Sequence, residues 1–194
     1  WPLYWNWVEA EPGEWDWEDY DRLVEDDTAQ GLQINAVLLG RPEWAADGDR
    51  LTGMHLPIFE DGSDTPRPGK AINPDNPWAN FVYQAVLRYQ PGGELAEERG
   101  WEGDRGIRVW EVWNEPDFNL FWSGSIGDYA RLLKISYLVI KLADPEAQVM
   151  FGGLLYNSND NWLARVLAIY LADPMSAEYG YFFDIVAVHS YSYA

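Results

Sequence analysis

A glutamate that follows an amide at the end of an apolar stretch is the most chemically suggestive feature of this 194-residue chain. In residues 109–117 (VWEVWNEPD) the apolar stretch ends in Asn114 and Glu115. On an alternating strand Glu111, Trp113 and Glu115 share one face, so the carboxyl of Glu115 is expected beside aromatic surface. A carboxyl partly removed from water holds its proton more readily, as a general acid must. The alternative is a lone glutamate that is solvated at a strand end.

Further candidates are a histidine and several aromatic residues. His189 and Tyr191 follow an apolar stretch at residues 184–188, and His55 has no partner at a recognisable spacing. By itself, His189 is more simply interpreted as a core histidine at a strand end. Aromatic residues form 16% of the chain, with 12 Trp. Indole rings either fill a core or serve as platforms for the apolar faces of sugar rings.

Apolar stretches of strand length alternate with helical segments in the order that would position these side chains. Five strands alternating with four helices indicate βα units and a parallel sheet, because parallel neighbours need a crossover connection. The strands are expected at residues 1–4, 32–39, 107–113, 148–153 and 184–188. The helices are expected at residues 16–30, 77–89, 125–143 and 163–171, with Asn76 and Ser125 as caps and Asp128 completing a capping box.

An open doubly wound sheet and part of a (β/α)8 barrel both fit this order. No glycine-rich phosphate-binding loop follows any strand, which favours the barrel. In a barrel, the long connection at residues 40–75 lies on the C-terminal face, where barrel active sites are built. The alternative for this connection is an acidic surface insertion. The expected fold class is therefore α/β, a partial (β/α)8 TIM barrel that forms a single, incomplete domain over residues 1–194.

The composition argues against several functional classes. With 13 Lys and Arg against 32 Asp and Glu, the formal charge is -19, which disfavours nucleic acid and membrane surfaces as partners. The absence of cysteine excludes disulfides, thiolate metal sites and cysteine nucleophiles, and two histidines argue against a histidine metal site. None of these features separates an extracellular from a cytoplasmic location.

Four motifs in order resemble the retaining (β/α)8 glycosidases of clan A. WEVWNEP at residues 110–116 resembles the signature of their fourth strand. The segments YWNWVEAEPGEWDW (4–17), AVLLGRPEWA (36–45) and FDIVAVHSY (183–191) resemble the ends of strands two, three and six. The resemblance is strongest to glycoside hydrolase family 39, the β-xylosidase and iduronidase group, or to a related family.

This resemblance implies a role for each candidate residue. Glu115 matches the general acid/base that hydrolyses O-glycosidic bonds with retention, and Asn114 matches the amide that binds the sugar 2-hydroxyl. His189 and Tyr191 match the pair that lines the pocket and supports the nucleophile or the substrate. The candidate sugar platforms are Trp44, Trp5 and Trp122. Glu111 is expected to form hydrogen bonds inside the barrel, and Trp113 to belong to the core.

The resemblance also predicts what this chain does not contain. A retaining enzyme needs a second carboxylate about 5–5.5 Å from the first as nucleophile. In the family this residue lies on strand seven, and the motifs here match strands two to six, so strands one, seven and eight are expected outside the chain. The chain alone is expected to be inactive. No metal or organic cofactor is implied, because two carboxylates suffice.

The expected substrate is a glycoside, oligosaccharide or polysaccharide, and neither the sugar nor the oligomeric state is specified. Two alternatives to a glycosidase remain. A carbohydrate-binding pseudoenzyme barrel would keep the tryptophan platforms without hydrolysis. An unrelated α/β hydrolase or oxidoreductase is the other, although the sequence contains no GxSxG nucleophile motif.

Overall fold

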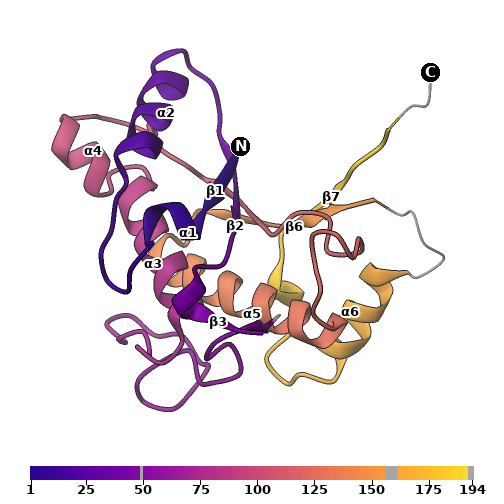
Figure 1. Ribbon diagram of the computed structural model, residues 1–194. Helices are drawn as coiled ribbons and strands as arrows, with labels where there is room; N and C mark the ends of the chain where they lie inside the picture. Colours follow the sequence, from indigo (N-terminus) through magenta and orange to yellow (C-terminus); the bar gives the residue numbers. More distant parts are fainter. Residues whose placement is uncertain (49, 156–160, 192–194) are drawn as a thin grey trace.

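Five parallel strands form the central sheet of the computed structural model, which describes residues 1–48, 50–155 and 161–191. Every neighbouring pair is parallel, so a crossover segment connects each strand to the next. In sheet order the strands are β1 (Pro2–Tyr4), β2 (Asn35–Leu39), β5 (Val109–Val112), β6 (Gln148–Leu154) and β7 (Ile185–Val188) (Figure 1). The parallel sheet confirms the α/β fold class predicted from the sequence.

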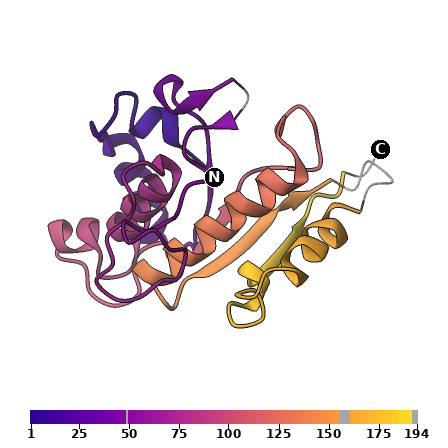
Figure 2. The same ribbon diagram turned by 90° about the horizontal axis from the view of Figure 1, so that it is seen from below.

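One long helix follows each of the first four strands of this sheet. Helix α5 packs against α3 and α6, and Figure 2 shows it running alongside β6. The four helices are α2 (Glu18–Ala29), α3 (Pro77–Tyr89), α5 (Ile126–Ala143) and α6 (Trp162–Leu171). They lie where the sequence pattern predicted helices. No helix in the described ranges is long and apolar enough to cross a bilayer.

Short-range capping signals begin two of these helices. The side chain of Asn76 accepts a hydrogen bond from the backbone N–H of Ala79, and Pro77 occupies the first turn of α3. Ser125 and Asp128 form the predicted capping box at the start of α5, each side chain accepting from the other residue's backbone N–H. These contacts satisfy amide groups that have no partner within the helix.

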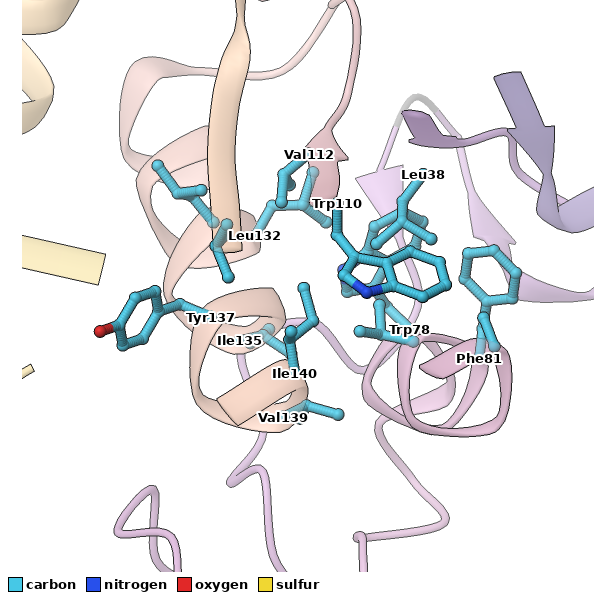
Figure 3. Close-up of a cluster of buried hydrophobic side chains, with 14 of the residues drawn as sticks. Leu38, Trp78, Phe81, Trp110, Val112, Leu132, Ile135, Tyr137, Val139 and Ile140 are labelled. Atoms are coloured by element: carbon cyan, nitrogen blue, oxygen red, sulfur yellow. The ribbon is translucent and has the colours of Figure 1, made fainter. Parts of the chain in front are cut away.

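The outer face of the sheet is buried beneath the helices. Leu38 of β2 and Val112 of β5 are register partners, and both are fully buried on this face. The ring of Trp110 lies beside Trp78 and Phe81 of α3 (Figure 3). Burial of several large rings here supplies much of the hydrophobic stabilisation, since about 25 cal/mol is gained per Å² of apolar surface removed from water.

The regular elements differ from the predicted ones mainly at their ends. Strand β2 begins at Asn35 instead of residue 32, and β5 ends at Val112 instead of Trp113, whose φ angle of 67° takes the backbone out of the extended region. Six further short elements in the described ranges, of two to six residues each, carry no clear periodicity, and the sequence did not predict them. They are α1 (Trp5–Val8), the 3-10 turns η1 (Glu43–Ala45) and η2 (Gly180–Phe182), the hairpin β3 (Ala46–Asp47) and β4 (Arg50–Leu51), and α4 (Glu94–Arg99).

Arg131 of α5 makes several contacts with the long connection at residues 40–75. The guanidinium of Arg131 donates to the backbone carbonyls of Met54 (3.0 Å) and Leu56 (2.6 Å) and pairs with the carboxylate of Asp64. The side chains of Ile58 and Phe59 in this segment are fully buried. The connection is therefore packed into the fold as well as being acidic at its surface.

Candidate active site

The candidate acid Glu115 follows an abrupt change of backbone direction at the end of β5. Trp113 and Glu115 both have positive φ angles, 67° and 45°. The prediction that these two side chains share a face by strand alternation is therefore wrong, because the extended backbone ends at Val112. Left-handed conformations cost side-chain-bearing residues roughly 1–2 kcal/mol each, and such strain is concentrated at functional sites.

A buried tyrosine and a glycine hold this strained strand end. The hydroxyl of Tyr129 donates to the carbonyl of Val112 (3.0 Å) and accepts from the N–H of Gly152 (2.9 Å). A Cβ atom on Gly152 would lie 2.7 Å from the carbonyl oxygens of Val112 and Trp113. The close approach of β6 to the end of β5 therefore requires glycine at this position.

Glu115 meets His189 and Tyr191 at one carboxylate oxygen. The side chain is 5% exposed, and its Oε1 lies 2.7 Å from Nδ1 of His189. The Tyr191 hydroxyl donates to the same oxygen at 3.0 Å. No hydrogen bond from a described residue reaches Oε2 of Glu115. The structure thus unites the three residues that the sequence selected, with one carboxylate oxygen held and the other available.

The interaction between Glu115 and Tyr191 changes the pKa of the tyrosine hydroxyl. The hydrogen bond to Glu115, reinforced by the negative charge of that carboxylate, raises the pKa of Tyr191 above its ordinary value. Tyr191 therefore remains a hydrogen-bond donor at neutral pH. The imidazole donates to Glu115 when Nδ1 carries the proton, which leaves Nε2 facing Gly153.

Glu111 lies within β5, and both of its carboxylate oxygens accept hydrogen bonds. Its Oε2 accepts from the side-chain amide of Asn35 on β2 (2.8 Å), and its Oε1 accepts from the N–H of Gly153 on β6 (2.8 Å). The prediction that Glu111 forms hydrogen bonds internally is confirmed. Because its two oxygens link β2 and β6 across β5, we assign this carboxylate to the framework and not to the chemistry.

The three candidate platforms differ in how much ring surface they expose. Trp5 is 0% exposed, enclosed by Trp44, Trp78 and Phe81. The expectation that Trp5 stacks on a sugar is corrected here, because a fully buried indole has no free face. Its Nε1 donates to Glu9 at 2.6 Å, and burial raises the pKa of Glu9 despite this hydrogen bond.

Trp44 and Trp122 lie nearer to the surface. Trp44 is half-buried, packs edge-on against Trp5 and donates from Nε1 to the Glu9 carbonyl at 3.1 Å. Trp122 is 8% exposed and lines a cavity together with Trp113. Asn114 is half-buried, and its amide makes no hydrogen bond to a described residue. The roles of these three residues toward a sugar stay predictions.

The cavity beside Trp113 has a volume of about 360 Å³. It lies between the segments that follow β2 and β5, the β3–β4 hairpin and the loop before α5. The side chains that give it its chemical character are Arg41, Arg50, Trp113, Phe121, Trp122 and Asp128. Neither this cavity nor any other part of residues 1–48, 50–155 and 161–191 holds a group of three or more histidines and carboxylates that could bind a metal ion.

Comparison with known proteins gives both sequence and fold relatives, although no family model matches the chain. The chain is 30% identical over 111 residues to a β-xylosidase of Caldicellulosiruptor saccharolyticus, covering 53% of this chain and 21% of the relative. It is 26% identical over 173 residues to a β-xylosidase of Geobacillus stearothermophilus, covering 89% and 30%. A monomeric β-xylosidase structure from Caulobacter crescentus CB15 matches with a TM-score of 0.58 and 26% identity, covering 91% of this chain and 31% of that one.

The chain is similar to family 39 glycoside hydrolases. A family 39 structure from Bacteroides cellulosilyticus WH2 has the same fold, with a TM-score of 0.60 and 20% identity over 97% of this chain and 31% of that chain. The five parallel strands are thus part of a (β/α)8 barrel, as the motifs implied. The chain spans about a fifth to a third of the length of the curated relatives it matches.

The family 39-like chain also contains site residues that the sequence reasoning missed. Gly153 lies beneath the imidazole, since a Cβ there would be 2.3 Å from Nε2 of His189. Arg41 and Arg50 line the cavity described above. Arg41 lies inside the motif AVLLGRPEWA, so its position next to a strand end was a usable signal. Nothing in the sequence alone distinguishes Gly153 from other strand glycines.

Proposed function

We propose that this chain supplies the acid/base side of the active site of a retaining glycosidase, with Glu115 as the proton donor and acceptor. One observation carries the proposal. The buried carboxyl of Glu115 has one oxygen bound by His189 and Tyr191 and the other free of described partners. Because Oε1 is held by these two hydrogen bonds, the orientation of the carboxyl is fixed, and so is the position of a proton carried on Oε2.

The reaction proceeds in two displacements. Protonated Glu115 donates its proton to the glycosidic oxygen while a second carboxylate attacks the anomeric carbon, which forms a glycosyl–enzyme and releases the alcohol. The Glu115 carboxylate then takes a proton from water, whose oxygen displaces the nucleophile with net retention of configuration. His189 and Tyr191 are positioning residues in this scheme, because they fix Oε1 and leave Oε2 to exchange the proton.

The substrate proposed is a glycoside, and a β-xyloside is the first one to test. The similar proteins from two organisms carry the name β-xylosidase. We assign to Asn114 the role of binding the sugar 2-hydroxyl, because its amide is adjacent to the acid and unengaged by described residues. Trp44 and Trp122 are the proposed aromatic contacts to the sugar.

We also propose that the 194 residues alone do not turn over glycosides. Retention requires two carboxylates about 5–5.5 Å apart. Within the described residues, the groups bonded to the Glu115 carboxylate are an imidazole and a phenol. Glu111 is occupied by Asn35 and Gly153 and serves the framework. The nucleophile is therefore assigned to a residue outside the described part of the chain.

The test compares Glu115→Gln with wild type in the full-length protein, using p-nitrophenyl β-D-xyloside and an alkyl β-xyloside. We expect a loss of about 10²–10⁴-fold in kcat with the alkyl leaving group, which needs protonation. The loss in glycosylation rate should be smaller with p-nitrophenol, and added azide should yield the β-xylosyl azide. Glu102→Gln, an exposed glutamate away from the site, is the matched control.

The outcomes separate the candidate functions. Equal activity of Glu115→Gln and wild type on the alkyl xyloside would contradict the acid/base assignment. An inverted product would contradict the double displacement. Saccharide binding without turnover by the wild-type full-length protein would instead favour the carbohydrate-binding pseudoenzyme.

A further inference from the structure

Strand β6 contains a bulge next to the candidate acid/base group. Residues 151–154 of β6 lie between the same two ladder pairs as residues 186–188 of β7, so β6 advances by three residues where β7 advances by two. A bulge interrupts the ladder and leaves backbone groups without a partner on the neighbouring strand. Buried N–H groups in native proteins nearly always have another acceptor. The N–H groups of Gly152 and Gly153, inside the bulge, therefore need acceptors from elsewhere in the fold.

Side chains from two other elements accept these N–H groups. The hydroxyl of Tyr129 on α5 accepts from Gly152 at 2.9 Å, and Oε1 of Glu111 on β5 accepts from Gly153 at 2.8 Å. Glu111 is 4% exposed, and its Oε2 accepts from the side-chain amide of Asn35 at 2.8 Å. The bulge is thus held by a buried carboxylate that is itself oriented from β2.

The bulge places both the backbone and the ring of His189. The backbone N–H of His189 donates to the carbonyl of Leu154 at 2.9 Å, immediately after the bulge. The imidazole lies against Gly153, where a Cβ would be 2.3 Å from Nε2 and 2.7 Å from Cδ2. The other ring nitrogen, Nδ1, is the one that lies 2.7 Å from Oε1 of Glu115. A shift of β6 at Gly153 would therefore move the imidazole relative to the acid.

We propose that Glu111 is a positioning residue for the acid/base Glu115. Its hydrogen bond to the N–H of Gly153 fixes the bulge of β6, and the bulge fixes the imidazole of His189. The two glutamates are four positions apart in the sequence, but the contacts that connect them run through β6 and β7. The inference rests on the proposed function, because its effect is measured through protonation of the glycosidic oxygen by Glu115.

The role requires a hydrogen-bond acceptor at this position and does not require a negative charge. Glu111→Gln keeps an oxygen toward Gly153 and directs an NH2 group toward Asn35. The Oδ1 atom of Asn35 is buried and has no hydrogen-bond partner among the described residues. A half-turn of the Asn35 amide brings this oxygen to the new NH2 group. Glu111→Gln should therefore preserve the bulge, whereas Glu111→Ala removes both acceptors.

The experiment measures kcat/KM of the full-length protein on an alkyl β-xyloside and on p-nitrophenyl β-D-xyloside. We expect Glu111→Ala to lower kcat/KM about tenfold on the alkyl xyloside, whose leaving group needs a proton. The loss on p-nitrophenyl β-D-xyloside should be less than about twofold, because p-nitrophenolate departs without protonation. Glu111→Gln should retain most of the wild-type activity on both substrates. A merely structural role would lower both values equally, since it would reduce only the amount of folded protein.

Asp144→Asn is the matched control. Asp144 is also a buried carboxylate, with a side chain that is 5% exposed and lies 2.8 Å from the guanidinium of Arg108. It precedes β6 and so lies at the opposite end of the strands from Glu115. Asp144→Asn should lower stability and leave the ratio of the two kcat/KM values unchanged.

Two further variants keep the test decisive. If Glu111→Ala does not fold, Asn35→Ala replaces it, because this change removes only the contact to Oε2 of Glu111. It should change the substrate ratio in the same direction by a smaller factor. In a His189→Ala background, Glu111→Ala should not change the ratio further, because the two residues act through one contact. Additive effects in this double variant would overturn the inference, as would Glu111→Gln being as impaired as Glu111→Ala.

The proton on Nδ1 of His189 provides a measurement that needs no turnover. Proton NMR of the full-length protein should show this N–H, assigned by its loss in His189→Gln. The signal should persist in Glu111→Gln and Asp144→Asn, and should shift or broaden in Glu111→Ala. An unchanged signal in Glu111→Ala would overturn the inference.

The inference and the proposed function fail separately. Turnover that depends on Glu115, with an unchanged substrate ratio and an unchanged His189 signal in Glu111→Ala, contradicts only the inference. A His189 signal that depends on Glu111, in a protein whose turnover is unaffected by Glu115→Gln, supports the positioning of the imidazole and contradicts the proposed function. If neither the signal nor the turnover responds to these changes, both are contradicted.

Discussion

The imidazole Nδ1 of His189 lies 2.7 Å from Oε1 of Glu115, although 74 positions separate the two residues in the sequence. One residue follows β5 and the other follows β7, with β6 between them in the sheet. Because all three strands are parallel, their C-terminal ends meet at one edge. This relationship turns two separate sequence motifs into one group around a single carboxylate.

Loss of the Tyr191 hydroxyl should weaken the hold on Oε1 of Glu115 without abolishing it. We expect Tyr191→Phe in the full-length protein to lower kcat on an alkyl xyloside by about tenfold, the effect of one hydrogen bond of about 1.5 kcal/mol. KM should change little, because the phenol contacts the acid and not the sugar. Tyr181→Phe, which removes a hydroxyl elsewhere, should leave both constants unchanged. An effect confined to KM would contradict the positioning role.

Gly153 should be intolerant of even one methyl group. In Gly153→Ala the new Cβ would lie 2.3 Å from Nε2 of His189, so the ring must move away from Glu115. We expect kcat to fall as far as in His189→Ala, and the double variant to be no worse than either single one. Gly127→Ala is the control, since its Cβ would meet only Ser125 Oγ at 3.6 Å. Additive losses in the double variant would refute the shared mechanism.

The Tyr129 hydroxyl should contribute to stability more than a surface hydroxyl does. It links the Val112 carbonyl to the Gly152 amide in a fully buried position. Tyr129→Phe leaves the Val112 carbonyl and the Gly152 N–H without this hydrogen-bond partner. The free energy of unfolding should therefore fall by about 1–3 kcal/mol in denaturant titrations. Tyr83→Phe, at a half-buried tyrosine whose hydroxyl bonds to no described residue, should cost less. Equal losses would contradict this account.

The Asp64–Arg131 pair should make stability depend on pH in the acid range. Burial raises the pKa of Asp64, but the hydrogen bond and charge of Arg131, the hydrogen bond from the Ile58 N–H and the charge of Lys134 together outweigh it, and the pKa lies below its ordinary value. A carboxyl with a lowered folded-state pKa adds stability above the unfolded value of about 3.9, and loses it as pH falls through the folded value.

Asp64→Asn should therefore destabilise the protein at pH 7 by about 1 kcal/mol. The difference from wild type should shrink as the pH falls below about 4, where the wild-type carboxyl also becomes neutral. Unfolding curves at several pH values measure this, with Asp104→Asn, a strongly exposed aspartate, as the control. A difference that grows toward low pH would have the wrong sign for this pair.

Local signals in the sequence were sufficient for most of the architecture. The caps at Asn76 and Ser125 act through hydrogen bonds to residues three positions along, so their patterns predict where α3 and α5 begin. Alternation of apolar strands with amphipathic helices likewise predicted the parallel sheet, because parallel neighbours need a crossover connection. Each signal depends on neighbours within one or two turns of chain, and those neighbours are readable from the sequence.

The site depended on contacts that no local pattern contains. The indole of Trp5 is buried because Trp78 and Phe81 close around it from a distant helix, so a residue chosen as a platform became core. The positive φ of Trp113 removed Glu115 from the face that alternation assigned to it. Sequence alone selected the acid and its histidine, whereas the packing of β5, β6 and β7 decided which oxygen is held and which glycine makes room. Side chains far apart in the chain acquire their environment only when the sheet brings them together.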